Sequence, residues 1–137
     1  MTSTSISAQL RRLVTQRASE SCEYCLIHQD VSIYSHEVDH IIALKHEGKT
    51  RADNLALSCL SCNRYKGSDL ATIDPVNDEI VPLFNPRRQV WEDHFVLNDA
   101  RIEGITQIGR ATARLLKLNA LNRIVERQVL IDQGRYP

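Results

Sequence analysis

This sequence has few aromatic residues and no long apolar run. Aromatic side chains make up 5% of the 137 residues, so a core built from this chain must be mostly aliphatic. A transmembrane helix needs roughly 20 consecutive apolar residues, and no run in the sequence approaches that length. We therefore expect no membrane span and no secretory signal. The expectation is a soluble cytoplasmic protein, formed by one domain or by one domain with an extension.

The sequence also has no excess of charge of either sign, with 17 basic and 17 acidic residues. Proteins dedicated to nucleic acid are usually basic, so the total argues mildly against that class. The distribution matters more, because a neutral total can hide a basic face. Between Ile105 and Val125 the chain has four basic residues and no acidic one. Three of them, Arg110, Arg114 and Lys117, share one side of an expected helix and are candidate DNA contacts, with a solvated face as the alternative.

What the sequence does have is four cysteines in two close pairs. They are Cys22 and Cys25 in "CEYC", and Cys59 and Cys62 in "CLSC". Disulfides are rare in a reducing compartment, and a C-x₂-C turn brings two sulfurs onto one ion. The pairs therefore predict a structural Zn²⁺ site of four thiolates, with no open position for catalysis. A redox-active pair, simple buried thiols and replacement of one thiolate by His28 are the alternatives.

The apolar pattern predicts a mixture of short helices and strands, the α+β class. We expect a helix over residues 5–19, a hairpin of two short strands within 30–44, and strands at 79–83 and just before Gly104. "NLALSC" fits either a short helix or an extended piece. Thr106 and Asn119 are expected N-caps of two later helices, the second of which should stop at Gly134.

Acids and histidines crowd the stretch "SHEVDHIIALKHEG" between the cysteine pairs. Hydrolysis of a phosphodiester needs a base, a divalent ion and groups that hold the backbone. Histidine titrates near neutral pH, which makes His40 a candidate base. Asp39 and Asn63 offer the oxygen ligands that Mg²⁺ or Mn²⁺ prefers. Neighbours in a strand point to opposite faces, so Asp39 and His40 share a site only if the strand bends or ends there; the alternative is a strand-end salt bridge.

The joint pattern "CEYC … HEVDHII … DNLALSCLSCNRYKG" resembles the HNH endonuclease family in its cysteine-flanked form. The resemblance covers about residues 20–67. It implies a ββα-metal (His-Me finger) core, in which a hairpin and a helix hold one divalent ion and zinc staples the ends. It assigns the general base to His40 and the ion to Asp39 and Asn63. It gives Asn54 the role of holding the loop and orienting the backbone of the base.

This sequence departs from the family pattern at Asn63, where many members have histidine. The later part of the chain, from "PLFNPRRQVWEDHF" to "GITQIGRATARLLKLN", also resembles an extension found on small bacterial, notably cyanobacterial, HNH proteins. We therefore expect three parts: an N-terminal helix (1–19), a nuclease core (20–70) and a C-terminal strand and helix extension that packs on the core (71–137).

The first functional hypothesis is a metal-dependent DNA endonuclease, with structural Zn²⁺ and catalytic Mg²⁺ or another divalent cation. Arg64 and Lys66 follow the second cysteine pair and are further candidate DNA contacts, since cations there could hold phosphates. A zinc-stapled nucleic-acid-binding module without catalysis is the second hypothesis. A structural or partner-binding zinc protein is the third. The pattern favours no particular oligomeric state.

Overall fold

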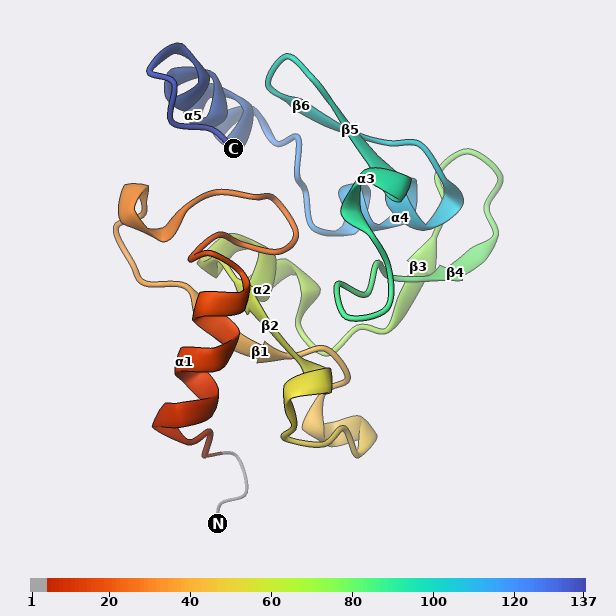
Figure 1. Ribbon diagram of the computed structural model, residues 1–137. Helices are drawn as coiled ribbons and strands as arrows, with labels where there is room; N and C mark the ends of the chain where they lie inside the picture. The colour runs from red at the N-terminus through yellow and green to blue at the C-terminus, as the bar shows by residue number, and fades with distance from the viewer. Residues whose placement is uncertain (1–4) are drawn as a thin grey trace.

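Short helices and strands alternate along the chain, which confirms the expected α+β class (Figure 1). The structure is a computed structural model that describes residues 5–137, so residues 1–4 of the expected first helix lie outside the described part. The helices are α1 (Ala8–Arg17), α2 (Leu60–Lys66), α3 (Trp91–His94), α4 (Gln107–Leu115) and α5 (Leu121–Asp132), with 3₁₀ turns at Gln29–Val31, Leu44–His46 and Ala52–Asn54. The strands are β1 (Glu37–His40), β2 (Leu55–Ser58), β3 (Ala71–Ile73), β4 (Ile80–Pro82), β5 (Phe95–Asn98) and β6 (Arg101–Gly104).

Strands β1 and β2 pair antiparallel and lead directly into α2, giving the ββα order that the sequence implied. In the register, Glu37 lies opposite Ser58 and His40 opposite Leu55. Cys59 is the N-cap of helix α2, and its sulfur accepts a hydrogen bond from the amide of Cys62. The second C-x₂-C turn therefore also forms the start of this helix.

The hairpin expected within residues 30–44 is wrong. The segment has one strand, β1, and its partner is the "LALS" stretch of β2. The residues expected to form the other strand bend through a 3₁₀ turn, and Ile33 is 94% exposed. A strand there would bury little apolar surface, whereas β2 is buried along its whole length. The open choice for "NLALSC" is therefore settled as extended.

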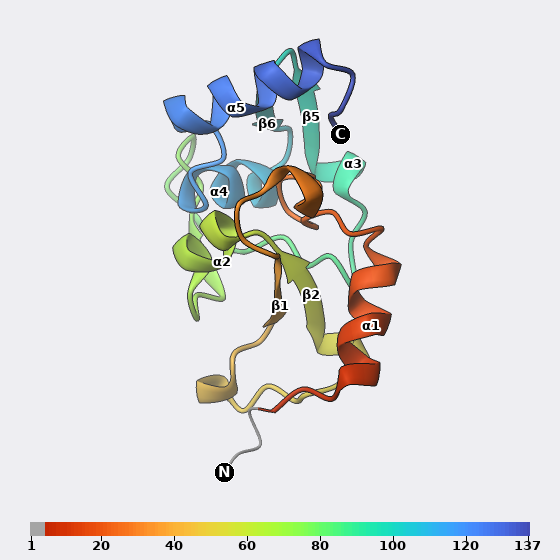
Figure 2. The ribbon, with the colours of Figure 1, turned by 90° about the vertical axis from the view of Figure 1, so that its left-hand side faces the viewer.

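Helix α1 covers one side of the β1–β2 pair (Figure 2). Ser7 caps it by accepting the amide of Leu10. Val14, fully buried, packs with Leu55 and Leu57 of β2 in a small apolar cluster. The amphipathic N-terminal helix is confirmed, and it holds the outer side of the strand pair that carries the candidate catalytic residues.

The C-terminal half holds two more two-stranded sheets, β3–β4 and β5–β6, with α4 and α5 beside them (Figure 1). Its apolar residues share one cluster with the four cysteines, including Phe84, Phe95, Ile102, Leu116 and Leu118. The extension therefore packs against the cysteine-bearing part. The division at residues 19 and 70 stays a prediction, since it concerns which parts fold on their own.

The two expected helix starts have different outcomes. Thr106 caps α4 by accepting the amide of Gly109, as expected. Asn119 does not cap α5: its side-chain amide bonds both the N–H and the C=O of Ile102 at 2.8 Å, and α5 starts after Ala120 without a side-chain cap. Both hydrogen bonds to the backbone of β6 use the side-chain amide that a cap would need, so Asn119 does not cap α5. Helix α5 ends as expected, with Gly134 at a positive φ of 69°.

Within residues 5–137, every helix is too short or too polar to cross a membrane.

Candidate metal centre and nuclease site

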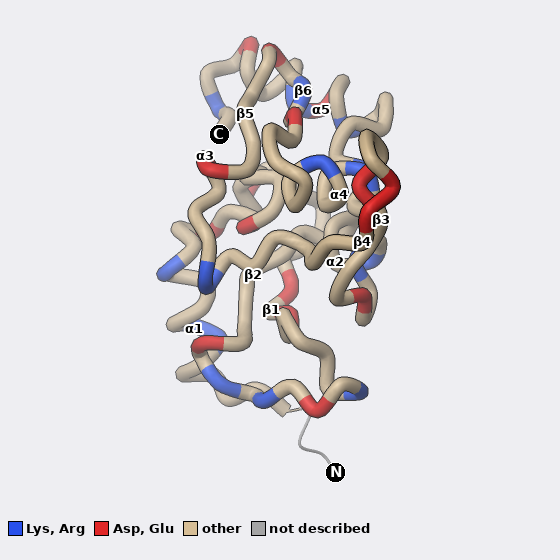
Figure 3. Tube along the Cα trace, turned by 90° about the vertical axis from the view of Figure 1, so that its right-hand side faces the viewer, with Lys and Arg blue, Asp and Glu red and all other residues tan. Residues whose placement is uncertain are grey.

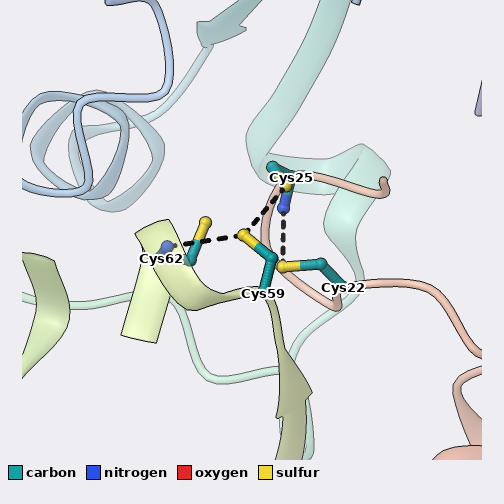
Figure 4. Close-up of side chains that lie close together, drawn as sticks. All are labelled: Cys22, Cys25, Cys59 and Cys62. Atoms are coloured by element: carbon teal, nitrogen blue, oxygen red, sulfur yellow. Dashed lines mark hydrogen bonds between the residues drawn. The ribbon is translucent and has the colours of Figure 1, made fainter. Parts of the chain in front are cut away.

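The four cysteine side chains meet between the ββα core and the C-terminal helices (Figure 4). Their sulfurs all lie within 4.8 Å of one another, and those of Cys25 and Cys59 are 3.7 Å apart. A zinc ion with bonds of about 2.3 Å to four sulfurs places them about 3.8 Å apart. All four cysteines are free and buried. The cluster therefore has the ligands and the size to hold a metal ion such as zinc.

Backbone amides point at the sulfurs as they do in metal-binding cysteine turns. The amides of Tyr24 and Cys25 each lie 3.4 Å from the sulfur of Cys22, and the amide of Cys62 lies 3.4 Å from the sulfur of Cys59. A thiolate accepts such hydrogen bonds better than a neutral thiol does. The amides of the two turns would thus stabilise thiolates at Cys22 and Cys59.

The surroundings act unequally on the four thiols. Burial raises the pKa of Cys22 and Cys62 well above the usual range. Hydrogen bonds, first from Cys22, lower the pKa of Cys25 and Cys59. At neutral pH the set does not ionise fully by itself, so the binding of a metal ion would release protons and acid would favour release of the ion.

Asp39 and His40 lie at the end of β1, where the strand stops. The Nε2 atom of His40 lies 2.9 Å from the hydroxyl oxygen of Thr50, in the loop before β2. Within residues 5–137 the other ring nitrogen, Nδ1, has no hydrogen-bond partner. Burial raises the pKa of Asp39, and the charge of Lys66 partly opposes that rise. Strand β1 ends at His40, and the shared site of Asp39 and His40 stays a prediction.

Lys66 lies inside the site rather than on the surface. Its ammonium donates to Asp39 Oδ2 at 3.1 Å and to the carbonyl oxygen of His40 at 3.2 Å, and its side chain is 3% exposed. This position fastens α2 to β1. The predicted contact of Lys66 with DNA phosphate stays a prediction, and one that would require this side chain to leave its buried partners.

Asn54 ties the two ends of the loop between β1 and β2 together. Its side-chain oxygen accepts the amide of Ile42 at 2.9 Å, and its side-chain nitrogen donates to the carbonyl oxygens of Ile42 at 3.0 Å and Lys49 at 2.8 Å. Its own carbonyl accepts the amide of Ile41, which follows His40. The loop that carries Thr50, and with it the contact to His40, is closed by these bonds.

Asn63 and Arg64 lie on α2, next to the second cysteine turn. Asn63 is half-buried and lies three residues before Lys66, so the two are neighbours on the helix surface. Arg64 is exposed. The structure thus brings the carboxylate of Asp39 and the backbone carbonyl of His40 into contact with Lys66, while the metal-binding role of Asn63 stays a prediction.

The basic stripe predicted on one helix is divided: Arg110 and Arg114 lie on α4, whereas Lys117 follows its end with a positive φ of 50°. Arg110 pairs with the buried carboxylate of Asp74 at 2.7 Å, which holds the pKa of Asp74 below its usual range. Arg114 and Lys117 are exposed, and the ammonium of Lys117 lies 5.0 Å from the centre of the Tyr65 ring on α2. Figure 3 shows the acidic β3–β4 turn beside the basic positions of α4. A hollow of about 480 Å³ is lined by residues that include Arg101, Arg110, Arg114 and Lys117.

Sequence reasoning missed Arg123, which donates to the sulfur of Cys62 at 3.1 Å. Arg123, Arg127 and Leu130 form the buried side of α5. Their i, i+4, i+7 spacing indicates that they share one side of the helix. Arginines on a helix usually face solvent, however, so the pattern does not by itself predict a buried side. Thr50 was missed as well, since a lone threonine in a polar loop carries no pattern.

Comparison with known families identifies the segment that contains this site. Residues 22–69 match the family model described as HNH endonuclease, whose members are usually nucleases acting on nucleic acid. The matched segment runs from the first cysteine of the cluster to just past α2. The chain matches no curated protein and no solved structure at a significant level. Residues 22–69 therefore form an HNH endonuclease-family domain, with a four-cysteine cluster consistent with the zinc-stapled form.

Proposed function

We propose that this protein is a metal-dependent endonuclease that hydrolyses DNA phosphodiester bonds. The observation that carries the proposal is the closed arrangement around the end of β1. There Asp39 and His40 meet Lys66 of α2, and the loop behind them is fixed by Asn54. The match of this same segment to the HNH family supports it.

In the proposed reaction, His40 is the general base. Thr50 holds Nε2 of the ring, which leaves Nδ1 to take a proton from the attacking water. Thr50 and the loop closed by Asn54 set the direction of the ring. The divalent ion, Mg²⁺ or a similar cation, would be held by Asp39 and Asn63. When bound, it supplies positive charge to the scissile phosphate and the leaving oxygen.

DNA would be held by cations beside this site. Arg64 on α2, Arg114 on α4 and Lys117 just after α4 are exposed, and the ammonium of Lys117 lies over the ring of Tyr65 of α2. The basic residues at the end of α4 thus adjoin α2. In our proposal they contact the phosphate backbone and confer no sequence preference.

A non-catalytic zinc-stapled nucleic-acid-binding module is the second candidate. The buried ion pair of Lys66 and Asp39 favours it, because that pair satisfies the carboxylate without a metal ion. In this candidate the residues at the end of β1 only join α2 to the strand pair.

The experiment is conversion of supercoiled plasmid to its nicked form with Mg²⁺, Mn²⁺ or Ni²⁺, and with EDTA. We expect nicking with at least one ion and none with EDTA. Asn63→Ala should raise the metal concentration needed for half-maximal rate, because one oxygen ligand is lost. Asn63→His should restore it, because imidazole also binds divalent ions. If wild type is folded and contains zinc but fails to nick the plasmid with any of the three ions, that result would support the binding module instead.

A further inference from the structure

The last helix, α5, delivers a buried positive charge to the cysteine cluster. Arg123 is 6% exposed. One end nitrogen of its guanidinium lies 3.1 Å from the sulfur of Cys62 and 3.8 Å from that of Cys59. The other donates to the carbonyl oxygen of Leu116 at 2.7 Å. The side chain is therefore held in place from both sides, with the sulfurs as one of its two anchors.

Charge balance gives this contact its meaning. No carboxylate of residues 5–137 lies within ion-pair distance of the Arg123 guanidinium. Burying an arginine without an opposite charge is costly. Four neutral thiols would offer no opposite charge, whereas four thiolates around a divalent ion carry a net charge of about −2. The metal-loaded cluster would thus place a counter-charge directly beside the Arg123 guanidinium, at the sulfur of Cys62.

Other residues of the C-terminal half cover the first cysteine turn. The indole nitrogen of Trp91 donates to the carbonyl oxygen of Tyr24 at 2.9 Å, and the hydroxyl of Tyr136 donates to that of Cys25 at 2.6 Å. These bonds and those of Arg123 come from three separate segments of the chain and reach both cysteine turns. The extension therefore forms the outer layer of the cluster.

We propose that Arg123 is a positioning residue for the metal centre, acting on the metal through the sulfurs of Cys62 and Cys59. Metal retention and docking of the C-terminal half then depend on each other. The loaded cluster holds α5 through Arg123, and Arg123 strengthens the hold of the thiolates on the ion. This inference needs a four-thiolate metal site but does not depend on nuclease activity.

Arg127 is a matched control on the same helix. It lies one turn after Arg123, is 2% exposed, and donates to the carbonyl oxygens of Ala100 and Leu118. Among its hydrogen bonds none goes to a sulfur. Arg123→Gln and Arg127→Gln therefore remove the same charge from the same buried face, and only the first removes the contact with the cluster.

The first measurement is metal affinity of the full chain. Wild type and variants are loaded with Cd²⁺, the thiolate-to-metal absorption is followed, and a chelator competes for the ion. We expect Arg123→Gln to weaken affinity by at least about tenfold, as loss of outer partners of metal ligands typically does. Arg127→Gln should stay within about twofold of wild type even where urea unfolding shows lower stability. Equal weakening in both variants, or none in Arg123→Gln, would overturn the proposal.

The second measurement needs no variant, so it tests the dependence of docking on the metal even if Arg123→Gln does not fold. Trp91 is the single tryptophan and bonds the first cysteine turn, so its fluorescence reports docking of the C-terminal half. Removing zinc from wild type should shift its emission to longer wavelength and make α5 sensitive to protease. Re-adding zinc should reverse both changes. Unchanged emission and protease resistance in metal-free protein would show that docking does not depend on the metal.

Discussion

At the scale of single residues, the candidate site combines side chains that the sequence pattern identifies with others that only the fold reveals. Asn54 was predicted to hold a loop, and its side chain does bond the backbone at Ile42 and Lys49. Lys66 was a candidate DNA contact, yet it is buried against Asp39. The sequence shows that a cation follows the second cysteine turn, but not which way it points, because that depends on how α2 meets β1.

Asn54→Ala removes three hydrogen bonds from the loop behind His40. At about 0.5–1.5 kcal/mol for each bond, we expect the free energy of unfolding to fall by about 1–3 kcal/mol, less than the sum because water replaces part of the loss. The nicking rate should fall as well, since Thr50 would no longer hold the ring of His40 steadily. Urea denaturation and the plasmid assay measure the two effects.

The control for this variant is Asn77→Ala. Asn77 accepts one amide, that of Glu79, in the exposed turn between β3 and β4. Its replacement should lower the free energy of unfolding by about 1 kcal/mol or less. The nicking rate should not change. If Asn54→Ala resembled Asn77→Ala in both assays, the loop-holding role of Asn54 would be refuted.

At the scale of elements, α4 shows how a basic stripe divides into structural and available charges. Arg110 holds Asp74 and so joins the helix to the β3–β4 turn. Because the pKa of Asp74 is lowered, this pair stabilises the fold at neutral pH and loses that effect as pH falls through the lowered pKa. Arg114 and Lys117 remain exposed. The sequence predicted the helix and its Thr106 cap, but the pairing of Arg110 depends on a turn far away in the chain.

The salt dependence of DNA binding should separate these charges. If Arg114 and Lys117 contact phosphates, changing both to Gln should weaken binding at low salt and lower the slope of log affinity against log salt by about 2. Arg110→Gln should change the slope by less than 1 but lower stability, because it breaks the pair with Asp74. Fluorescence anisotropy with labelled duplex DNA measures the slopes. Identical slopes for wild type and the double variant would assign these residues to an ordinary solvated face.

At the scale of the whole molecule, the two halves meet at the cysteine cluster. Each sheet has only two strands, which rarely suffices for independent stability. The cluster and the apolar residues around it, such as Phe84 and Leu118, supply the common core. The ββα order was predictable because its residues form a joint pattern of cysteines, Asp39-His40 and asparagines. That the extension packs on the core was expected as well, but its particular contacts, such as that of Arg123 with Cys62, were not, because they join residues distant in sequence.

The measurement that tests the central claim most directly is the single-turnover rate of DNA cleavage by His40→Ala, relative to wild type at saturating metal. His46→Ala is the control, because His46 is an exposed histidine of the same stretch whose ring contacts the carbonyl oxygen of Ser68. Loss of a general base should lower the rate by about 10²–10⁴-fold, with zinc content unchanged, while His46→Ala keeps the wild-type rate. Equal rates for His40→Ala and wild type would contradict the account, since the cleavage would then not depend on His40.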